Sequence, residues 1–432
     1  MKRLSTMFFC FVLAAQLCFA QKFYSIESEP GENCSNEIRI SWATDTTTAD
    51  SWVVYSKVSD RDWRGSSSIA AQESYRCDSY NGIWSDNEKG EPFYENVIFT
   101  KCGTSLTGLK PDTEYKYYIT DGTDRSSEHR FKTAGAKEWS ACIISDFHSY
   151  PPLASRLDHA MNMVNTVKFY DPSVSWILSP GDVVAYGGSY SFWKRLFEEN
   201  NFSRFMWARV NGNHDNWTKR TVMDKSFEMP NRFFMGTSYV PRNGYGPEVG
   251  RSYWFRYGDA MFVMMNTEAM HFEEGFIPAK EWLEKVVTEA RAGKDAPRYV
   301  VVCMHYEWFV GTSGKTSQYG RWHEVFDKLG VDLAVAGNNH VYVRTHPLYG
   351  DQVTDGSKGT VYVVTSSSDN GRGRKFQDAP MLNPDKIVFR WTEGSHTVSA
   401  IHMNVNRKRI KLTLLDREGN VVDACEVPSK KR

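Results

Sequence analysis

Residues 331–340 read Val-Asp-Leu-Ala-Val-Ala-Gly-Asn-Asn-His and join an apolar run to a polar ending. The run at 331–336 predicts a buried strand, and Gly337, Asn338 and His340 follow it directly. Four earlier segments also place polar side chains directly after an apolar run: Ser145-Asp146-Phe147-His148, Gly181-Asp182, Gly212-Asn213-His214-Asp215 and Cys303-Met304-His305. Because open α/β sheets build their sites beyond the carboxyl ends of strands, we expect all five segments to meet at one site.

The residue types in these segments are those that bind metal ions. In Asp146-Phe147-His148 one residue separates the two polar side chains, so an extended loop can turn both toward one cation. A lone carboxylate such as Asp182 can bridge two metals with its two oxygens, and the glycines allow close approach of the backbone. Each segment alone is ordinary, since Gly-Asp usually marks a turn and a strand histidine such as His305 is usually structural. Five of them in this order favour a metal site.

The pattern around the segments predicts an α/β domain. Apolar runs predict strands at 140–145, 174–179, 205–210, 299–304 and 332–336, and helical stripes predict helices at 153–164, 191–199 and 322–329. A turn at Gly258-Asp259 predicts a hairpin of 252–257 and 260–266. A further helix is expected to begin at Pro278. From residue 360 the pattern returns to strands.

Together the five segments resemble the ordered motifs of the calcineurin-like metallophosphoesterase superfamily: Asp-x-His, Gly-Asp, Gly-Asn-His-Asp/Glu, His and Gly-His-x-His. The resemblance extends from Trp139 to the C-terminus. The preceding β-rich region, the run His305-Tyr306-Glu307-Trp308 and residues 331–344 are similar to the purple acid phosphatases. For residues 138–428 the resemblance implies an α/β sandwich of two mixed sheets flanked by helices, which hydrolyses small phosphate esters.

The resemblance also implies a role for each site residue. The expected ligands are Asp146, His148, Asp182 and His340 for a first metal, and Asp182, Asn213 and His305 for a second. His214, set by Asp215, is expected to bind a phosphoryl oxygen or to protonate the leaving group. Mixed nitrogen and oxygen ligands suit two divalent or trivalent ions, with Fe, Zn and Mn as the candidates.

Two positions depart from the family pattern. Purple acid phosphatases carry a Tyr three residues after the Gly-Asp aspartate and no His in the first motif. Here Ala185 stands at that position, Tyr186 follows it, and His148 is present, so we expect a first site ligated by histidine rather than by tyrosinate. Asn338 stands where the family has a histidine that binds the second metal. Either its amide oxygen replaces the imidazole and weakens the binding of Zn-like cations, or Asn338 is no ligand, and both alternatives stay open.

Residues 22–133 carry an all-β pattern. Apolar and polar side chains alternate at 37–42, which predicts a half-buried strand. The stretch Lys110-Pro111-Asp112-Thr113-Glu114-Tyr115 has the layout of a tyrosine corner, in which the phenol bonds back to upstream backbone. The region resembles a fibronectin type III-like sandwich, with residues 71–94 as an inserted loop and residues 134–137 as the linker to the α/β domain.

Residues 1–20 have the features of a secretory signal peptide. Met1-Lys2-Arg3 supplies positive charge, an apolar run follows at 7–13, and Ala20 is a small residue suited to cleavage. We therefore expect export to a periplasmic or extracellular compartment, where disulfides are permitted.

Composition argues against several other classes. The 52 Lys and Arg residues balance 52 Asp and Glu residues, so net charge gives no sign of a nucleic-acid partner. No run approaches the ~20 apolar residues of a transmembrane helix. Cys34, Cys77 and Cys102 could supply one disulfide, and the oligomeric state stays open.

Two other classes of function compete with hydrolysis. Asn338 allows a binding or scaffold protein whose metallophosphoesterase fold has an impaired second metal site. Recognition of surface glycans by the N-terminal region is a third hypothesis, which no residue in 22–133 specifically supports. Candidates for substrate contacts lie near the motifs and comprise Tyr186, Trp217, Tyr306, Trp308, Tyr342, Arg372 and Arg374.

Overall fold

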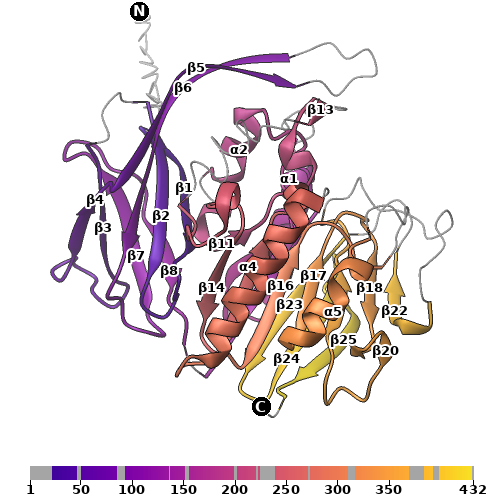
Figure 1. Cartoon of the computed structure of the whole chain (residues 1–432). Helices are drawn as coiled ribbons and strands as arrows, with labels where there is room; N and C mark the ends of the chain where they lie inside the picture. The colour runs from indigo at the N-terminus through magenta and orange to yellow at the C-terminus, as the bar shows by residue number, and fades with distance from the viewer. Residues whose placement is uncertain are drawn as a thin grey trace, which may run out of the picture.

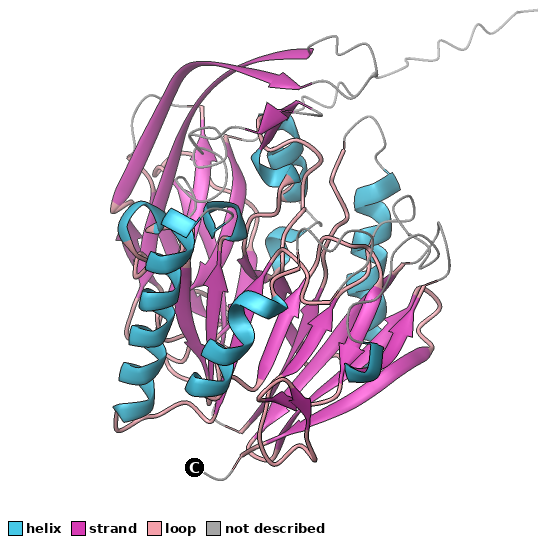
Figure 2. Ribbon diagram, turned by 45° about the vertical axis from the view of Figure 1, so that its right-hand side comes forward, coloured by secondary structure: helices cyan, strands magenta, loops and turns pink. Residues whose placement is uncertain are grey.

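The computed structural model describes residues 22–430 except for 46–49, 85–92, 136, 151–154, 199–201, 220–221, 224–238, 271–272, 310–316, 369–383 and 393–397. Two large β-sheets with helices on their outer faces form the main body, and a smaller β-rich region stands beside it (Figures 1 and 2). The predicted signal peptide lies outside the described residues, so export stays a prediction.

The seven-stranded sheet is mixed. Four strands, β15, β16, β17 and β21, run parallel to their neighbours in this group, and antiparallel strands flank them on both sides. In spatial order the strands are β14 (Tyr253–Tyr257), β15 (Ala260–Met265), β16 (Tyr299–Met304), β17 (Leu333–Ala336), β21 (Val361–Val364), β18 (Tyr342–Thr345) and β22 (Ile387–Trp391). The hairpin expected around Gly258 is confirmed in β14 and β15.

The ten-stranded sheet is also mixed, with β9, β10 and β11 parallel at its centre. In spatial order its strands are β25 (Val421–Pro428), β24 (Arg409–Asp416), β23 (Ser399–Asn406), β9 (Glu138–Ile143), β10 (Val174–Ser179), β11 (Met206–Arg209), β1 (Phe23–Pro30), β2 (Ile38–Thr44), β6 (Phe93–Leu106) and β5 (Glu73–Trp84). The last four belong to the N-terminal region. The sheet is therefore continuous across the two regions, and β1 joins β11 in parallel at Ser28 and Met206.

Alternate side chains of the seven-stranded sheet divide between two cores. On β16, Val301 packs into the core shared with the ten-stranded sheet, whereas Val302 packs under α4 (Glu273–Ala292) and α5 (Tyr319–Leu329). Successive side chains leave opposite faces of a strand, so a strand that is apolar throughout must be covered on both sides. The expected α/β sandwich of two mixed sheets flanked by helices is confirmed.

Helix α1 (Ser155–Tyr170) contacts β9, β23 and β24 of the ten-stranded sheet. Its predicted apolar stripe is confirmed by the burial of Leu157, Ala160 and Val164, while Leu153 lies outside the described residues. The other described elements are α2 (Tyr190–Leu196), β12 (Trp217–Lys219), β13 (Val222–Met223), β19 (Leu348–Tyr349), β20 (Gln352–Val353) and the short turns η2 (Phe202–Arg204), η3 (His214–Asn216), η4 (Gly246–Glu248), η5 (Thr267–Met270) and η7 (Pro384–Lys386).

The predicted helix start at Pro278 is wrong. Helix α4 begins at Glu273 and carries Pro278 inside it. Pro278 is the sixth residue of the helix. It lacks the N–H that would donate to the carbonyl of Glu274, and its ring crowds that carbonyl, so its cost falls near the helix start. Glu273 and Glu274 stand near the positive end of the helix dipole, which favours the earlier start.

The N-terminal region adds a four-stranded antiparallel sheet to β1, β2 and β6. In spatial order its strands are β4 (Ser67–Ala70), β3 (Trp52–Lys57), β7 (Glu114–Thr120) and β8 (His129–Lys132). The predicted tyrosine corner is confirmed, because the N–H of Lys110 donates to the phenol oxygen of Tyr115 at 3.0 Å.

Two expectations for this region are wrong. Much of the segment 71–94 is no loop, since β5 pairs antiparallel with β6, and Figure 1 shows the resulting ribbon arching over the α/β domain. Its sequence lacks the apolar alternation by which strands are recognised, and backbone pairing needs no particular side chain. The second expectation is a disulfide among Cys34, Cys77 and Cys102. Cys34 and Cys102 instead carry free buried thiols, and the side chain of Cys77 lies outside the described part.

A buried charge cluster joins the N-terminal strands to β11. Glu27 on β1 accepts hydrogen bonds from Lys101 Nζ at 3.0 Å and from Arg209 Nη2 at 2.6 Å. Glu29, also on β1, is fully buried and accepts the N–H of Tyr239 at 2.9 Å. Burial and the charge of Glu27 raise the pKa of Glu29 to about 7. The pKa of Glu27 is lowered, because Arg209 and Lys101 outweigh the effect of its burial.

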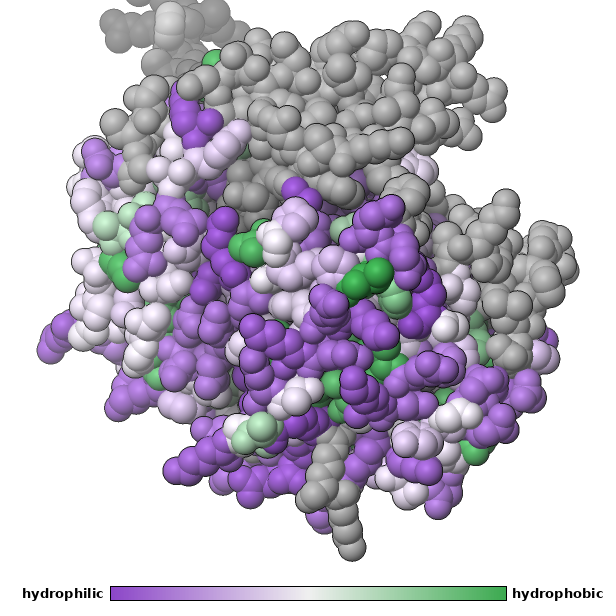
Figure 3. All heavy atoms as spheres, viewed as in Figure 1, coloured by the Kyte–Doolittle hydropathy of each residue, from purple (hydrophilic) through white to green (hydrophobic). Residues whose placement is uncertain are grey.

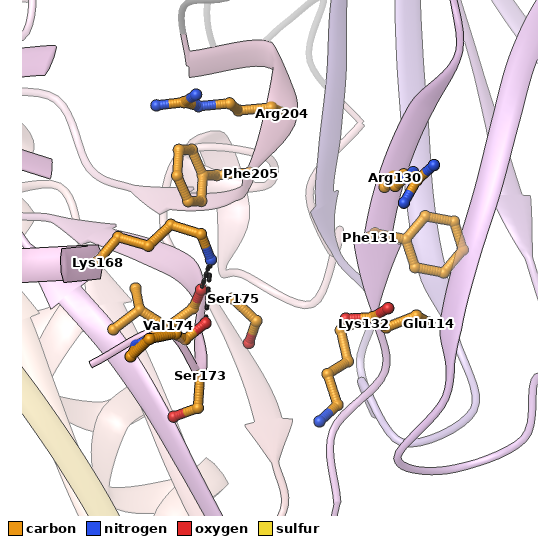
Figure 4. Close-up of a pocket in the computed structure, with 11 residues that line it drawn as sticks. Glu114, Arg130, Phe131, Lys132, Lys168, Ser173, Val174, Ser175, Arg204 and Phe205 are labelled. Atoms are coloured by element: carbon orange, nitrogen blue, oxygen red, sulfur yellow. Dashed lines mark hydrogen bonds between the residues drawn. The ribbon is translucent and has the colours of Figure 1, made fainter. Parts of the chain in front are cut away.

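A pocket of about 360 Å³ also lies between the two regions (Figure 4). Arg130 and Lys132 of β8 line one side, and Lys168 and Arg204 line the other. Lys168 Nζ donates to the carbonyls of Pro172 and Val174, which closes the turn after α1. The junction is therefore dry at the charge cluster and open at this pocket.

The described surface is mainly hydrophilic in the view of Figure 3, with single apolar side chains scattered over it. Helix α4, with 20 residues, alternates apolar and charged side chains. Neither it nor any other helix in the described part of the chain combines the length and the apolarity of a membrane span.

We expect Glu29→Gln to stabilise the protein at neutral and alkaline pH. The pKa of Glu29 rises from its ordinary value of 4.5 to about 7 on folding, so its contribution to stability is present below the lower value and is lost as the pH rises through the higher one. The difference corresponds to on the order of 3 kcal/mol. Thermal melts between about pH 5 and about pH 8 should show the variant gaining on wild type as the pH rises.

The matched control is Glu27→Gln. This change leaves Lys101 and Arg209 buried without their charged partner, and we expect it to destabilise the protein by about 3–5 kcal/mol. A lower melting temperature of Glu29→Gln at about pH 8 would show instead that the fold needs a charged Glu29.

Candidate metal centre

The predicted segments meet where parallel strands of both sheets end. Asp146 follows β9, Asp182 follows β10 and Asn213 follows β11, which are neighbours in the ten-stranded sheet. His305 follows β16 and His340 follows β17, which are neighbours in the seven-stranded sheet. Because the two sheets share a core, the loops at their carboxyl ends enclose one small volume.

The backbone is strained at the candidate ligands. Asp146, His148, Asp182, Asn338 and His340 have φ between 47° and 72°, and they are five of the nine described non-glycine residues with positive φ. This left-handed conformation is unfavourable by roughly 1–2 kcal/mol per residue and persists where the surrounding structure imposes it. The strain marks these loops as functional independently of their sequence.

Glycines let the loops approach one another, as expected from the sequence. A Cβ on Gly212 would lie 2.1 Å from Asp182 Oδ1 and 2.7 Å from His305 Cε1. A Cβ on Gly337 would lie 2.6 Å from Asp146 Oδ2. A side chain at either position would therefore push a candidate ligand out of place.

The first candidate group consists of Asp146, His148 and His340. Their ligand atoms lie within 4.8 Å of one another, and all three side chains are buried. His148 Nδ1 donates to the carbonyl of Asp146 at 2.8 Å, which leaves the Nε2 lone pair 3.1 Å from Asp182 Oδ2. His340 Nε2 lies 3.5 Å from Asp146 Oδ1.

The second candidate group shares Asp182 Oδ2 with the first. His305 Nδ1 donates to the carbonyl of Pro180 at 2.8 Å. Its Nε2 therefore faces Asp182 Oδ2 at 3.4 Å and Asn213 Oδ1 at 3.1 Å. Asp146, Asp182 and His305 also have ligand atoms within 4.8 Å of one another. Asp182 thus stands between both groups, in the position of a bridging carboxylate.

This donor set fits metal ions. The imidazole lone pairs of His148 and His305 point at carboxylate oxygens, and two acceptors are stable in that arrangement only with a proton or a cation between them. Burial disfavours charge on His305, yet Asp182 raises its pKa to about 10. Burial and the charge of Asp182 raise the pKa of Asp146 to about 7. The field in the site therefore attracts positive charge strongly.

Asp215 was predicted to orient His214, and the structure shows other contacts for its carboxylate. Its two carboxylate oxygens accept four backbone N–H groups, from Asp182 and Gly212 at 2.8 Å and from Val183 and Val184 at 3.0 Å. The side chain is fully buried. Asp215 therefore fixes the loop of Asp182 to the loop of Asn213.

His214 is oriented by the backbone instead. Its Nδ1 donates to the carbonyl of Ala185 at 3.0 Å, and its N–H donates to Asp182 Oδ1 at 2.9 Å. The ring is half-buried, with its centroid 4.4 Å from that of His148 and 3.9 Å from that of Trp217. A His214 ring nitrogen also forms a group with His148 and Asp182 within 4.8 Å. With Nδ1 bonded to this carbonyl, Nε2 is the ring nitrogen that a proton transfer by His214 would use.

Asn338 lies at the same edge, half-buried, and its side-chain amide is bonded to Glu307. Its Nδ2 donates to Glu307 Oε2 at 2.6 Å, while its backbone N–H donates to Asp146 Oδ1 at 3.0 Å. Glu307 was not expected among the site residues. The only sequence signal for it is its place two residues after His305.

Serine side chains hold Asp146, and these too were missed. Ser145 Oγ donates to the Asp146 carboxylate, and Ser367 Oγ donates to the Asp146 carbonyl at 2.7 Å. Ser367 lies in the run Thr365-Ser366-Ser367-Ser368 after β21, the strand next to β17. The rule that found the other segments, a polar ending after an apolar strand, would have found this one.

The other candidates separate by burial. Trp308 is fully buried against Phe326, and Tyr342 is buried with its hydroxyl donating to Asp423 at 2.9 Å, so both belong to the core. Tyr186 packs against Phe192 with ring centroids 6.1 Å apart. Tyr306 is buried with its ring centroid 5.5 Å from that of His305. Trp217 is half-buried beside His214, and Arg372 and Arg374 lie outside the described residues.

Comparison with known proteins gives the same division of the chain. Residues 25–133 match the model of the purple acid phosphatase N-terminal domain, and residues 141–342 match that of the calcineurin-like phosphoesterases. The uncharacterized protein Rv2577 of Mycobacterium tuberculosis (strain H37Rv) is 24% identical over 380 residues, covering 77% of this chain and 67% of the relative. An uncharacterized protein of the CDC 1551 strain, MT2654, matches with the same figures.

Two solved structures share the fold. The purple acid phosphatase PPD1 from yellow lupin (Lupinus luteus) seeds has a TM-score of 0.70 at 16% identity, covering 95% of this chain and 75% of that one. PhoD has a TM-score of 0.55 at 12% identity, covering 96% and 94%. The chain therefore combines a purple acid phosphatase N-terminal domain with a calcineurin-like phosphoesterase domain, a family that uses divalent metals. Its fold is that of the purple acid phosphatases.

We expect Gly212→Ala to disrupt the metal centre. The added Cβ would displace Asp182 and His305, and metal affinity measured by calorimetry should fall at least about tenfold. Gly320→Ala on α5 is the matched control, because a Cβ there meets nothing within 4 Å. The control should keep its metals and gain up to about 1 kcal/mol of stability. Equal metal binding by both variants would show that the loops are not tightly opposed.

Proposed function

We propose that the protein is an exported phosphoesterase that hydrolyses small phosphate esters at a centre of two divalent or trivalent metal ions. The observation that supports this most is the position of Asp182 between two imidazoles whose lone pairs face it, His148 at 3.1 Å and His305 at 3.4 Å. Such a carboxylate can bind two cations at once. The export signal expected in residues 1–20 is part of the proposal.

Each metal would have its own protein ligands. Asp146, His148, Asp182 and His340 would hold the first, and Asp182, Asn213 and His305 the second. Fe, Zn and Mn are the candidates, since the ligands mix nitrogen and oxygen. When bound, such a pair supplies a water of lowered pKa and neutralises charge on the phosphoryl group.

The half-buried edge of the site faces the substrate. His214 and Asn213 lie there, and the ring of Trp217 contacts that of His214 at a tilt, with a centroid distance of 3.9 Å. His214 Nε2 would donate a hydrogen bond to a phosphoryl oxygen or a proton to the leaving oxygen. Trp217 would contact the leaving group, which favours esters with a flat organic portion.

The direct test is hydrolysis of an aryl phosphate monoester and of a diester by the full chain loaded with Mn, Zn or Fe. We expect turnover with at least one ester, loss of turnover on chelation and recovery on adding the metal back. Asp182→Asn should lower kcat on the order of 10³-fold, because the bridging charge is lost. No turnover with any of these metals would favour the binding or scaffold role, and unchanged turnover by Asp182→Asn would sink the mechanism.

His214 and Asp215 should separate chemistry from architecture. We expect His214→Ala to lower kcat about 10²- to 10⁴-fold with little change in melting temperature. Asp215→Asn should destabilise the protein by about 2–4 kcal/mol, because an amide accepts fewer of the four buried N–H groups and adds donors of its own. Kinetics and thermal melts of both variants check this. A stable but inactive Asp215→Asn variant would instead support a catalytic role for Asp215.

A further inference from the structure

Asn338 is held at both its backbone and its side chain. Its N–H donates to the two carboxylate oxygens of Asp146 at 3.0 and 3.2 Å. Its Nδ2 donates to Glu307 Oε2 at 2.6 Å, and its backbone is left-handed with φ of 72°. These contacts fix the plane of the amide, so the group has a defined direction at the edge of the site.

Glu307 stands behind Asn338 rather than beside the ligands. Its side chain is fully buried. It belongs to none of the three groups of described carboxylates and imidazoles whose ligand atoms cluster within 4.8 Å. A hydrogen bond from an amide to an ionised carboxylate is shorter and stronger than one between neutral groups, which agrees with the 2.6 Å separation. Glu307 therefore reaches the centre through the side chain of Asn338.

Anchoring of one end of an amide directs the other. Asparagine carries its two donors on Nδ2 and its acceptor lone pairs on Oδ1. With Nδ2 turned to Glu307, Oδ1 turns away from that carboxylate. The backbone of the same residue is bonded to Asp146, so the side chain starts within the ligand loops.

We propose that Glu307 is a positioning residue that presents Asn338 Oδ1 as a ligand of the second metal, and that this pair shifts the site toward hard cations. The inference rests on the proposed two-metal function. The second metal would then have two amide oxygens, from Asn213 and Asn338, with the His305 imidazole and the shared Asp182 carboxylate.

The ligand atoms determine which cation the second site prefers. Zn²⁺ gains more than Mn²⁺ from an imidazole, whereas amide and carboxylate oxygens suit Mn²⁺ and Mg²⁺. A carboxylate behind a ligand commonly fixes its orientation and raises its basicity, and loss of such a partner lowers metal affinity about 10- to 100-fold. Here Glu307 would fix the position of the Asn338 amide, and the atom offered to the metal would be an oxygen.

The experiment is calorimetric titration of the chelator-treated full chain with Mn²⁺ and, separately, Zn²⁺, with a thermal melt of each variant. We expect two equivalents of metal for wild type. Glu307→Leu should weaken the second equivalent about 10- to 100-fold and leave the first unchanged. Glu307→Gln keeps an acceptor for Asn338 Nδ2 and should recover most of that affinity. Asn338→His should strengthen Zn²⁺ binding at least about tenfold more than Mn²⁺ binding.

Glu268→Gln is the matched control, because Glu268 is a buried carboxylate near Tyr306 and His305. If Glu307 acted only through its charge, Glu268→Gln and Glu307→Gln would weaken the second metal equally, and the inference would fail. Unchanged binding by Glu307→Leu, or equal gains for both cations in Asn338→His, would also overturn it. Two bound metals without turnover would refute the proposed hydrolysis and leave the Glu307 inference standing, so the two failures are distinguishable.

Discussion

Four backbone N–H groups from two loops donate to one buried carboxylate, that of Asp215. Removal of this acceptor would leave buried donors unpaired, at about 1–3 kcal/mol for each. The contact matters because it fixes the Asp182 loop against the Asn213 loop, and both the close packing at Gly212 and the left-handed backbone of Asp182 depend on that alignment. The candidate metal centre is thus built on a hydrogen-bonded frame.

On this frame the backbone orients the candidate ligands. His148 and His305 each commit one ring nitrogen to a backbone carbonyl, which settles the tautomer and directs the other nitrogen at Asp182. His214 follows the same rule with the Ala185 carbonyl, but on the half-buried side of the site. Backbone carbonyls therefore orient all three rings. Their positions differ, because the two candidate ligands are buried and His214 is half-buried.

The sequence predicted the fold and the meeting of the five segments because both follow from local patterns. Apolar strands such as 299–304 can be recognised by composition, and polar endings at the carboxyl end of parallel strands must converge. The contacts of Asp215 with four backbone N–H groups were not predicted, because every residue has a backbone N–H and no motif displays it. Glu307 was missed because its contact with Asn338 joins residues 31 positions apart. The β5–β6 ribbon was missed because its sequence has no apolar alternation, and backbone pairing does not require one.

The continuity of the ten-stranded sheet affects how the protein unfolds. β1 lies between β2 and β11, and Arg209 at the end of β11 is paired with Glu27 of β1 three residues before Gly212. Opening the N-terminal region would expose that ion pair and remove one of the two neighbours of β11, the strand that precedes Asn213 and His214. The two regions that look separable in the sequence therefore share one sheet: excising the α/β half would leave an exposed edge on the strand that precedes its candidate metal-binding loop.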